Sequence, residues 1–143
     1  MIRKLKTNPQ EIDRVMNLWL ESTIKGHPFI SKAYWQKNYA LIRDVYIPKS
    51  DTFVYTENGE LLGFISILDK SYIGALFVAV SHQGKGTGRK LLEYAYQTYG
   101  NLTLAVYKEN TQALEFYIRR GFDIIDTQIN EDSGHSECIM VKK

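Results

Sequence analysis

Residues 76–89 read LFVAVSHQGKGTGR, and this stretch decides the fold. It begins with an apolar run, continues through a short polar turn, and ends in three alternate glycines, Gly84, Gly86 and Gly88. Beyond the glycines, apolar residues recur at spacings of three and four, which is the period of a helix: Leu91, Leu92, Ala95, Tyr96 and Tyr99. We therefore predict a strand over 72–80, a glycine turn and the start of a helix.

This arrangement predicts a phosphate site. Free backbone N–H groups and the helix dipole favour an anion at a helix N-terminus, and glycines let a ligand approach the backbone closely. A Walker A loop is excluded because Gly88 is followed by Arg89 and Lys90 rather than by Lys and Ser or Thr. The G-x-G-x-x-G spacing of a dinucleotide site is also missing, since Arg89 stands three residues after Gly86.

Length and composition indicate a single domain over residues 1–143. With 44% hydrophobic residues the chain can bury a core, and its 18 basic and 16 acidic residues are interspersed, so we expect no nucleic-acid partner. A single cysteine, Cys138, excludes a disulfide framework and a multi-cysteine zinc site. It favours a cytoplasmic protein without a metal. No long apolar run is present, so we expect no membrane segment.

The order of the predicted elements implies an α/β (α+β) mixed sheet with helices on both faces. Helices are expected after the cap residues Asn8, Ser31 and Asn110 and after the glycine turn. His27 and Phe29 fall in the loop between the first two helices, and Asn58-Gly59 predicts a hairpin turn. The expected strands lie at 2–6, 52–57, 60–68, 72–80, 102–107, 122–129 and 138–141.

Two motifs resemble the signatures of the GCN5-related N-acetyltransferases (GNAT). Residues 83–88 read QGKGTG and resemble the Q/R-x-x-G-x-G/A pyrophosphate loop of that family. Residues 110–117 read NTQALEFY, followed by Gly121-Phe122, and resemble its N-x-x-A-x-x-F-Y…G-F signature. Residues 18–30 further resemble a small bacterial branch that includes protein-lysine acetyltransferases. The resemblance implies a mostly antiparallel sheet of about seven strands with a splay after the fourth.

The resemblance also implies a site for acetyl-CoA. The N–H groups of 83–89 would bind the pyrophosphate, the strand ending near Val80 would pair with the pantetheine arm, and Asn110 would contact that arm from the other side. Ala113 and Phe116 leave room for the cofactor beside their helix. The implied cofactor-binding residues are Leu76, Phe77, Val78, Val80, Gln83, Gly84, Lys85, Gly86, Thr87, Gly88, Arg89, Asn110, Ala113 and Phe116.

Tyr117 matches the family's helix tyrosine and is the implied catalytic acid. A phenol with a pKa of about 10 stays protonated at neutral pH and can donate its proton to the departing thiolate. A backbone N–H of residues 76–78 would stabilise the oxyanion. Many relatives carry a carboxylate base on the central strand, but residues 72–80 contain none, so we expect a water chain to accept the proton. No covalent intermediate is expected, because attack is direct in a ternary complex.

The acceptor is expected to be a primary amine of a protein lysine or an N-terminus. A small-molecule amine is the alternative acceptor, and a non-catalytic acyl-CoA sensor is the alternative outside the enzymes. His27, Phe29 and Tyr72 are the candidate acceptor-side residues, although His27 also suits an ordinary loop. Whether the protein is a monomer or a homodimer stays open at this point.

Overall fold

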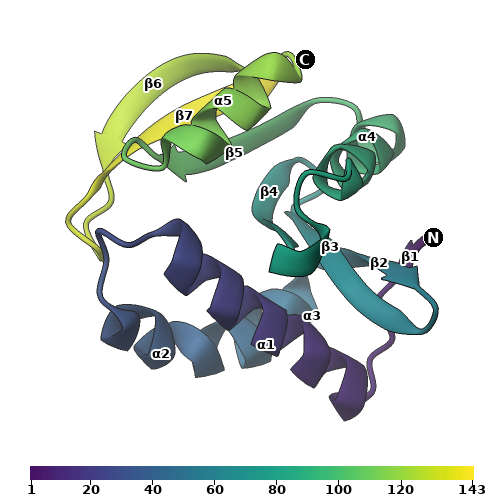
Figure 1. The fold of residues 1–143 in the computed structure, drawn as a ribbon. Helices are drawn as coiled ribbons and strands as arrows, with labels where there is room; N and C mark the ends of the chain where they lie inside the picture. The colour runs from purple at the N-terminus through teal and green to yellow at the C-terminus, as the bar shows by residue number, and fades with distance from the viewer.

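The computed structural model describes all of residues 1–143 and contains one seven-stranded sheet in the order β1-β2-β3-β4-β5-β7-β6 (Figure 1). All neighbouring strands run antiparallel except β4 and β5, which run parallel. The strands are β1 (Ile2–Lys4), β2 (Asp51–Glu57), β3 (Glu60–Leu68), β4 (Tyr72–Val78), β5 (Leu102–Tyr107), β6 (Asp123–Ile129) and β7 (Ser136–Lys142). The predicted mixed sheet is therefore confirmed.

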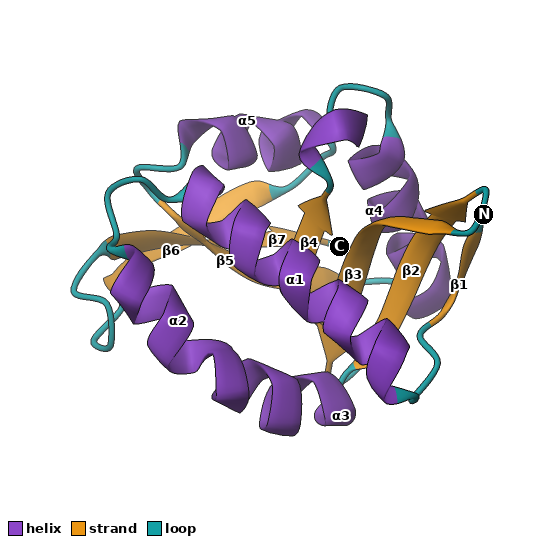
Figure 2. Ribbon diagram, turned by 60° about the horizontal axis from the view of Figure 1, so that its bottom comes forward, coloured by secondary structure: helices purple, strands orange, loops and turns teal.

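Helices cover both faces of the sheet, as the sequence predicts (Figure 2). The helices are α1 (Pro9–Gly26), α2 (Lys32–Leu41), α3 (Ile47–Lys49), α4 (Thr87–Tyr99) and α5 (Thr111–Arg119), and a π-helical turn at Ile42–Tyr46 joins α2 to α3. One core packs α1 and α2 against one face, with Val15, Trp19 and Phe64 among its residues. The other core packs α4 and α5 against the opposite face, around Leu91 and Met140.

The predicted caps and the predicted hairpin turn are present. Asn8, Ser31 and Asn110 each accept a backbone hydrogen bond at the start of α1, α2 and α5. Asn58 and Gly59 have φ values of 51° and 80°, the left-handed conformation that a two-residue hairpin turn needs. These local signals therefore set the ends of the elements correctly.

The sheet divides between β4 and β5. Only Tyr72 and Ile73 of β4 pair with β5, whereas β4 stays paired with β3 up to Val78. The strands then diverge, which confirms the predicted splay and leaves the β5-facing edge of β4 without a strand partner. A ligand with hydrogen-bonding groups can pair with such an edge.

The starts of β2 and β6 differ from the predicted strand bounds by one residue, and larger differences occur in β4, β1 and β7. β4 ends at Val78 rather than Val80, because the N–H of His82 donates to Ala79 O at 2.8 Å and bends residues 80–82 into a 3₁₀ turn. β1 is shorter than 2–6 because only residues 2–4 pair with β2. β7 is longer than 138–141, since its pairing with β5 and β6 extends over Ser136–Lys142.

Candidate active site

The glycine loop places an uncapped helix N-terminus at the end of β4. Gly84 and Gly86 have φ values of 80° and 83°, which favour glycine, and Gly86 leads directly into α4. α4 begins without a side-chain cap, in contrast to α1, α2 and α5. Its first N–H groups therefore remain available to an anion, which fits the expected pyrophosphate.

Basic side chains surround this N-terminus. Lys85, Arg89 and Lys90 are exposed next to the loop. A cavity of about 570 Å³ continues from Arg89 along α4 toward the C-terminal ends of α5 and β7, and its basic lining residues are Arg89, Arg119, Arg120 and Lys142. Arg120 also lies over the Phe116 ring, with its guanidinium carbon 4.4 Å from the ring centroid. The cofactor side of the molecule thus offers positive charge over a wider surface than the sequence motif indicated.

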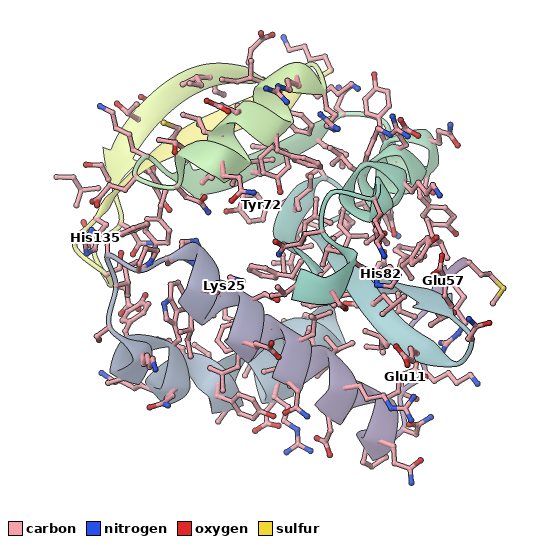
Figure 3. The ribbon with its side chains drawn as sticks, in the orientation of Figure 1. Glu11, Lys25, Glu57, Tyr72, His82 and His135 are labelled. Atoms are coloured by element: carbon pink, nitrogen blue, oxygen red, sulfur yellow. The ribbon has the colours of Figure 1, made fainter.

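Side-chain contacts hold the loop against the sheet. Gln83 Nε2 donates to Val78 O at 3.3 Å, and His82 Nε2 lies 3.2 Å from Glu57 Oε2. Tyr55 donates its hydroxyl to the other oxygen of Glu57 at 3.0 Å. Figure 3 shows Glu57 and His82 side by side at the β2–β3 end of the molecule. His82 therefore helps to hold the loop against the sheet.

α5 lies across the wide end of the splay. A side chain at Gly88 would come within 3.5 Å of Phe116 and Val78, so the start of α4, the end of β4 and α5 meet at this point. Ala113 packs against the same core, as does Leu76 from β4. The side chain of Phe77 points to the other face of the sheet and packs against the α1 core. Val80 is exposed in the 3₁₀ turn. The expected cofactor path thus runs past Leu76, Gly88 and Phe116, whereas Phe77 and Val80 lie away from it.

Tyr117 is buried in α5 beside this path. Its ring packs against Phe116 and Phe122, with centroids 5.2 and 5.4 Å away. Burial raises the pKa of Tyr117 above its ordinary value, and no other group shifts it. The phenol therefore keeps its proton at neutral pH, as a general acid must.

The structure brings His27 and Asn110 together although they lie 83 residues apart. His27 Nδ1 donates to the carbonyl of Thr23 at 2.7 Å, so Nε2 carries the lone pair and faces the Asn110 amide nitrogen at 3.5 Å. Asn110 uses its oxygen to cap α5. Burial lowers the pKa of His27, and the Thr23 hydrogen bond opposes this shift. His27 is thus a buried, neutral side chain beside the expected cofactor contact.

Tyr72 and Phe29 occupy two parts of the same face. Tyr72 opens β4 on the side of α1 and α2 and lines an apolar cavity of about 250 Å³ together with Trp19 and Tyr46. Phe29 packs edge to face on His27, with ring centroids 5.7 Å apart, and also contacts Tyr107. Figure 3 shows Tyr72 in the middle of the molecule, between α1 and the C-terminal strands, and His135 where the β6–β7 turn approaches the α1–α2 loop.

Two further residues of this region, Tyr107 and Glu137, were not predicted from the sequence. The Trp35 ring lies 5.0 Å from His27 and the Tyr107 ring lies 5.3 Å from it, so both enclose the histidine. Glu137 is only 8% exposed and lies opposite Tyr107 on β7. Extending the period-two pattern of β7 back from Val141 and Ile139 would have placed Glu137 on the same face as these two residues, opposite Cys138 and Met140.

The family model of the acetyltransferase (GNAT) domain matches residues 25–143 of the chain. The chain is a GNAT acetyltransferase. This GNAT acetyltransferase is 40% identical over 140 residues to the peptidyl-lysine N-acetyltransferase YiaC of Escherichia coli K12, covering 98% of this chain and 94% of YiaC. It is 30% identical over 135 residues to the peptidyl-lysine N-acetyltransferase YjaB of Salmonella typhimurium, covering 94% of this chain and 92% of YjaB.

Solved structures share the fold of this GNAT acetyltransferase. The solution structure of apo YjaB from Escherichia coli superposes with a TM-score of 0.83 at 25% identity, covering 99% of this chain and 97% of that one. An aminoglycoside 6′-N-acetyltransferase in complex with coenzyme A gives a TM-score of 0.74 at 17% identity, covering 99% and 96%. The latter likeness concerns the fold alone.

The GNAT acetyltransferase is therefore an enzyme that moves an acetyl group from acetyl-CoA to an amine-bearing acceptor, as its family model and its relatives indicate. Its uncapped α4 N-terminus, the surrounding basic side chains and the free edge of β4 fit the phosphates and the amide-containing arm of that donor. The structure has no group of three or more His, Cys, Asp or Glu side chains that could hold a metal ion. None of its helices combines the length and apolar character needed to cross a bilayer.

Proposed function

We propose that this enzyme acetylates lysine side chains of proteins. The observation that carries the proposal is its 40% identity, over 98% of the chain, with a protein named as a peptidyl-lysine N-acetyltransferase. The open face beside Tyr72 supports it, because an aromatic and apolar surface suits the methylene stem of a lysine side chain. We place the reaction in the cytoplasm, since the free Cys138 suits a reducing compartment.

The donor is held mainly by the backbone of the cofactor side. The N–H groups at residues 83–89 bind the pyrophosphate, and the unpaired edge of β4 pairs with the pantetheine arm. The thioester then lies in the splay, where an N–H of residues 76–78 stabilises the oxyanion. The cavity lined by Arg89, Arg119, Arg120 and Lys142 offers charge to the remaining phosphate of coenzyme A.

The chemistry is direct acyl transfer. A lysine ammonium has a pKa of about 10.4, so it loses a proton to ordered water before its nitrogen attacks the thioester carbonyl. The carbon–nitrogen bond forms and the attacking nitrogen gives its second proton to ordered water. The carbon–sulfur bond breaks, and Tyr117 gives its proton to the departing sulfur and regains one from solvent before the next turnover. Burial keeps that proton on the phenol until the transfer.

A thiol-release assay tests this function. The purified protein is given acetyl-CoA and a panel of acceptors: lysine peptides, peptides with a free N-terminus but no lysine, polyamines and aminoglycosides. We expect thiol release with the lysine peptides and an acetylated lysine in the product by mass spectrometry. Turnover confined to another acceptor class would contradict the lysine assignment. Binding of acetyl-CoA without turnover on any acceptor would favour a sensor.

A further inference from the structure

Glu137 is a buried carboxylate without a cationic partner. Glu137 is 8% exposed, and its carboxylate takes part in no salt bridge. Its hydrogen-bond partner is the neutral amide of Gln128, whose Nε2 donates to Oε1 at 2.6 Å. Taking a carboxylate out of water is costly unless a cation or several donors compensate it. One donor therefore leaves most of this cost uncompensated.

Glu137 lies on the acceptor side of the sheet. Cys138 and Met140, which alternate with it along β7, pack into the core under α4 and α5. Glu137 therefore points to the opposite face, on which its pairing partner Tyr107 packs against the α1 core. This is also the face on which Tyr72 opens β4 beside the point where β4 and β5 part.

The carboxylate lies close enough to both tyrosines to affect them. Burial is the main cause that raises the pKa of Tyr72 and of Tyr107, and the charge of Glu137 adds to the rise in each. Asp132 contributes further negative charge at Tyr107, and it accepts a hydrogen bond from Tyr34 at 2.6 Å. The region around Tyr72 and Tyr107 therefore combines aromatic rings with the negative charges of Glu137 and Asp132.

We propose that Glu137 binds the ammonium group of the acceptor. This inference rests on the proposed function, since a lysine side chain supplies both a cation for the carboxylate and an apolar stem for the aromatic rings. An ammonium supplies the hydrogen-bond donors that Glu137 lacks, and aromatic faces attract cations. Glu137 selects the acceptor by charge and aligns it beside the splay, in a family member whose central strand carries no carboxylate.

The matched contrast is Glu11, which is buried to the same degree. Glu11 is 7% exposed, and Arg3 donates to both of its oxygens at 2.6 and 3.0 Å while the N–H of Lys6 donates at 2.9 Å. The chain thus satisfies one buried carboxylate with its own residues and leaves the other without a cation. The difference points to an external cation at Glu137.

The experiment is a binding cycle between Glu137 and the acceptor ammonium. The probes are the lysine peptide with the fastest thiol release and the same peptide with norleucine, which keeps the stem and removes the charge. Dissociation constants are measured by calorimetry with coenzyme A present, for the wild type and for Glu137→Gln. We expect the wild type to prefer lysine by about tenfold or more, and Glu137→Gln to bind both peptides nearly equally.

Three controls separate the possible results. Glu131→Gln removes an exposed charge from the same β6–β7 turn and keeps the wild-type preference. The affinity for coenzyme A and the melting temperature of Glu137→Gln show whether the site and the fold are intact. A wild-type preference for lysine in an intact Glu137→Gln variant would overturn the ammonium site alone. Absence of thiol release from every lysine peptide in the wild type would overturn the proposed function, and the ammonium site with it.

Discussion

The two faces of the sheet are built by different means. On the face under α4 and α5, the proposed cofactor contacts come from backbone groups of one continuous stretch, residues 76–89, and from one helix that crosses it. On the face under α1 and α2, the proposed acceptor surface is made of side chains from segments far apart in the chain, such as Tyr72, Tyr107 and Glu137. The first face can be recognised from a motif, and the second requires the structure.

The largest effect should come from the backbone-built face. Gly86→Val puts a branched side chain at a φ of 83° in the loop before α4, so the N–H groups can no longer converge on the pyrophosphate. We expect calorimetry to detect no coenzyme A binding. Gly59→Val is the matched control, because Gly59 has a φ of 80° in the β2–β3 hairpin and should bear the same strain. Normal affinity in Gly86→Val would contradict the phosphate loop.

Tyr117→Phe should separate chemistry from binding on the same face. It removes only the hydroxyl, which has no hydrogen-bond partner affecting its pKa, so packing against Phe122 is kept. We expect kcat to fall by about 10²- to 10⁴-fold, as for a lost general acid, with little change in coenzyme A affinity. Tyr94→Phe on α4 is the control and keeps full activity. If Tyr117→Phe also keeps full activity, the tyrosine is only packing.

The two buried carboxylates should respond oppositely to loss of charge. Glu11→Gln breaks a bidentate pair with Arg3 and should lower the free energy of unfolding by about 1–3 kcal/mol. Glu137→Gln removes an unpaired charge, so its free energy of unfolding should stay within about 0.5 kcal/mol of the wild-type value or exceed it. Urea titrations of the free proteins measure both. A large loss of stability in Glu137→Gln would make that carboxylate structural and erase the contrast.

The smallest predicted effect concerns the pH dependence of His27. Because burial lowers the His27 pKa below its ordinary value of about 6.5, the unfolded chain binds more protons than the native one below neutral pH. Neutral His27 therefore makes its full contribution to the free energy of unfolding at a pH above its pKa in the unfolded chain. This contribution is lost as the pH falls through the pKa of His27 in the native protein. His27→Gln should therefore flatten the decline in melting temperature on acidification from pH 7. His135→Gln should not.

The same division explains how much the sequence predicted. Asn8, Ser31, Asn110 and the Asn58-Gly59 pair act on backbone groups a few residues away, so their effects could be predicted correctly from local patterns. Alternating glycines after an apolar run likewise predicted the loop and the uncapped helix. The end of β4 was missed because hydrogen bonds from His82 and Gln83 override an apolar run that continues to Val80.

The acceptor side could not be predicted because its contacts join residues that are far apart in the sequence and meet only in the folded chain. Nothing near residue 27 indicates that His27 will face Asn110, and nothing near residue 137 indicates Tyr72. His27 and Tyr72 were named for their positions in a loop and at a strand start, which the structure places on one face without testing their roles. Tyr107 was overlooked because an aromatic residue in a strand more often belongs to the core.

The short pairing between β4 and β5 also affects how the native protein unfolds locally. Strands β1 to β4 and strands β5 to β7 form two half-sheets that share only the pairs Tyr72–Thr103 and Ile73–Leu104. Both half-sheets contribute to the core under α4 and α5, but their backbone pairing is confined to these two pairs, so amide hydrogen exchange should resolve the two halves in the free protein. A donor molecule that bridges the splay adds contacts to both halves. Its binding should slow exchange throughout β5, β7 and β6, well beyond the residues that it contacts.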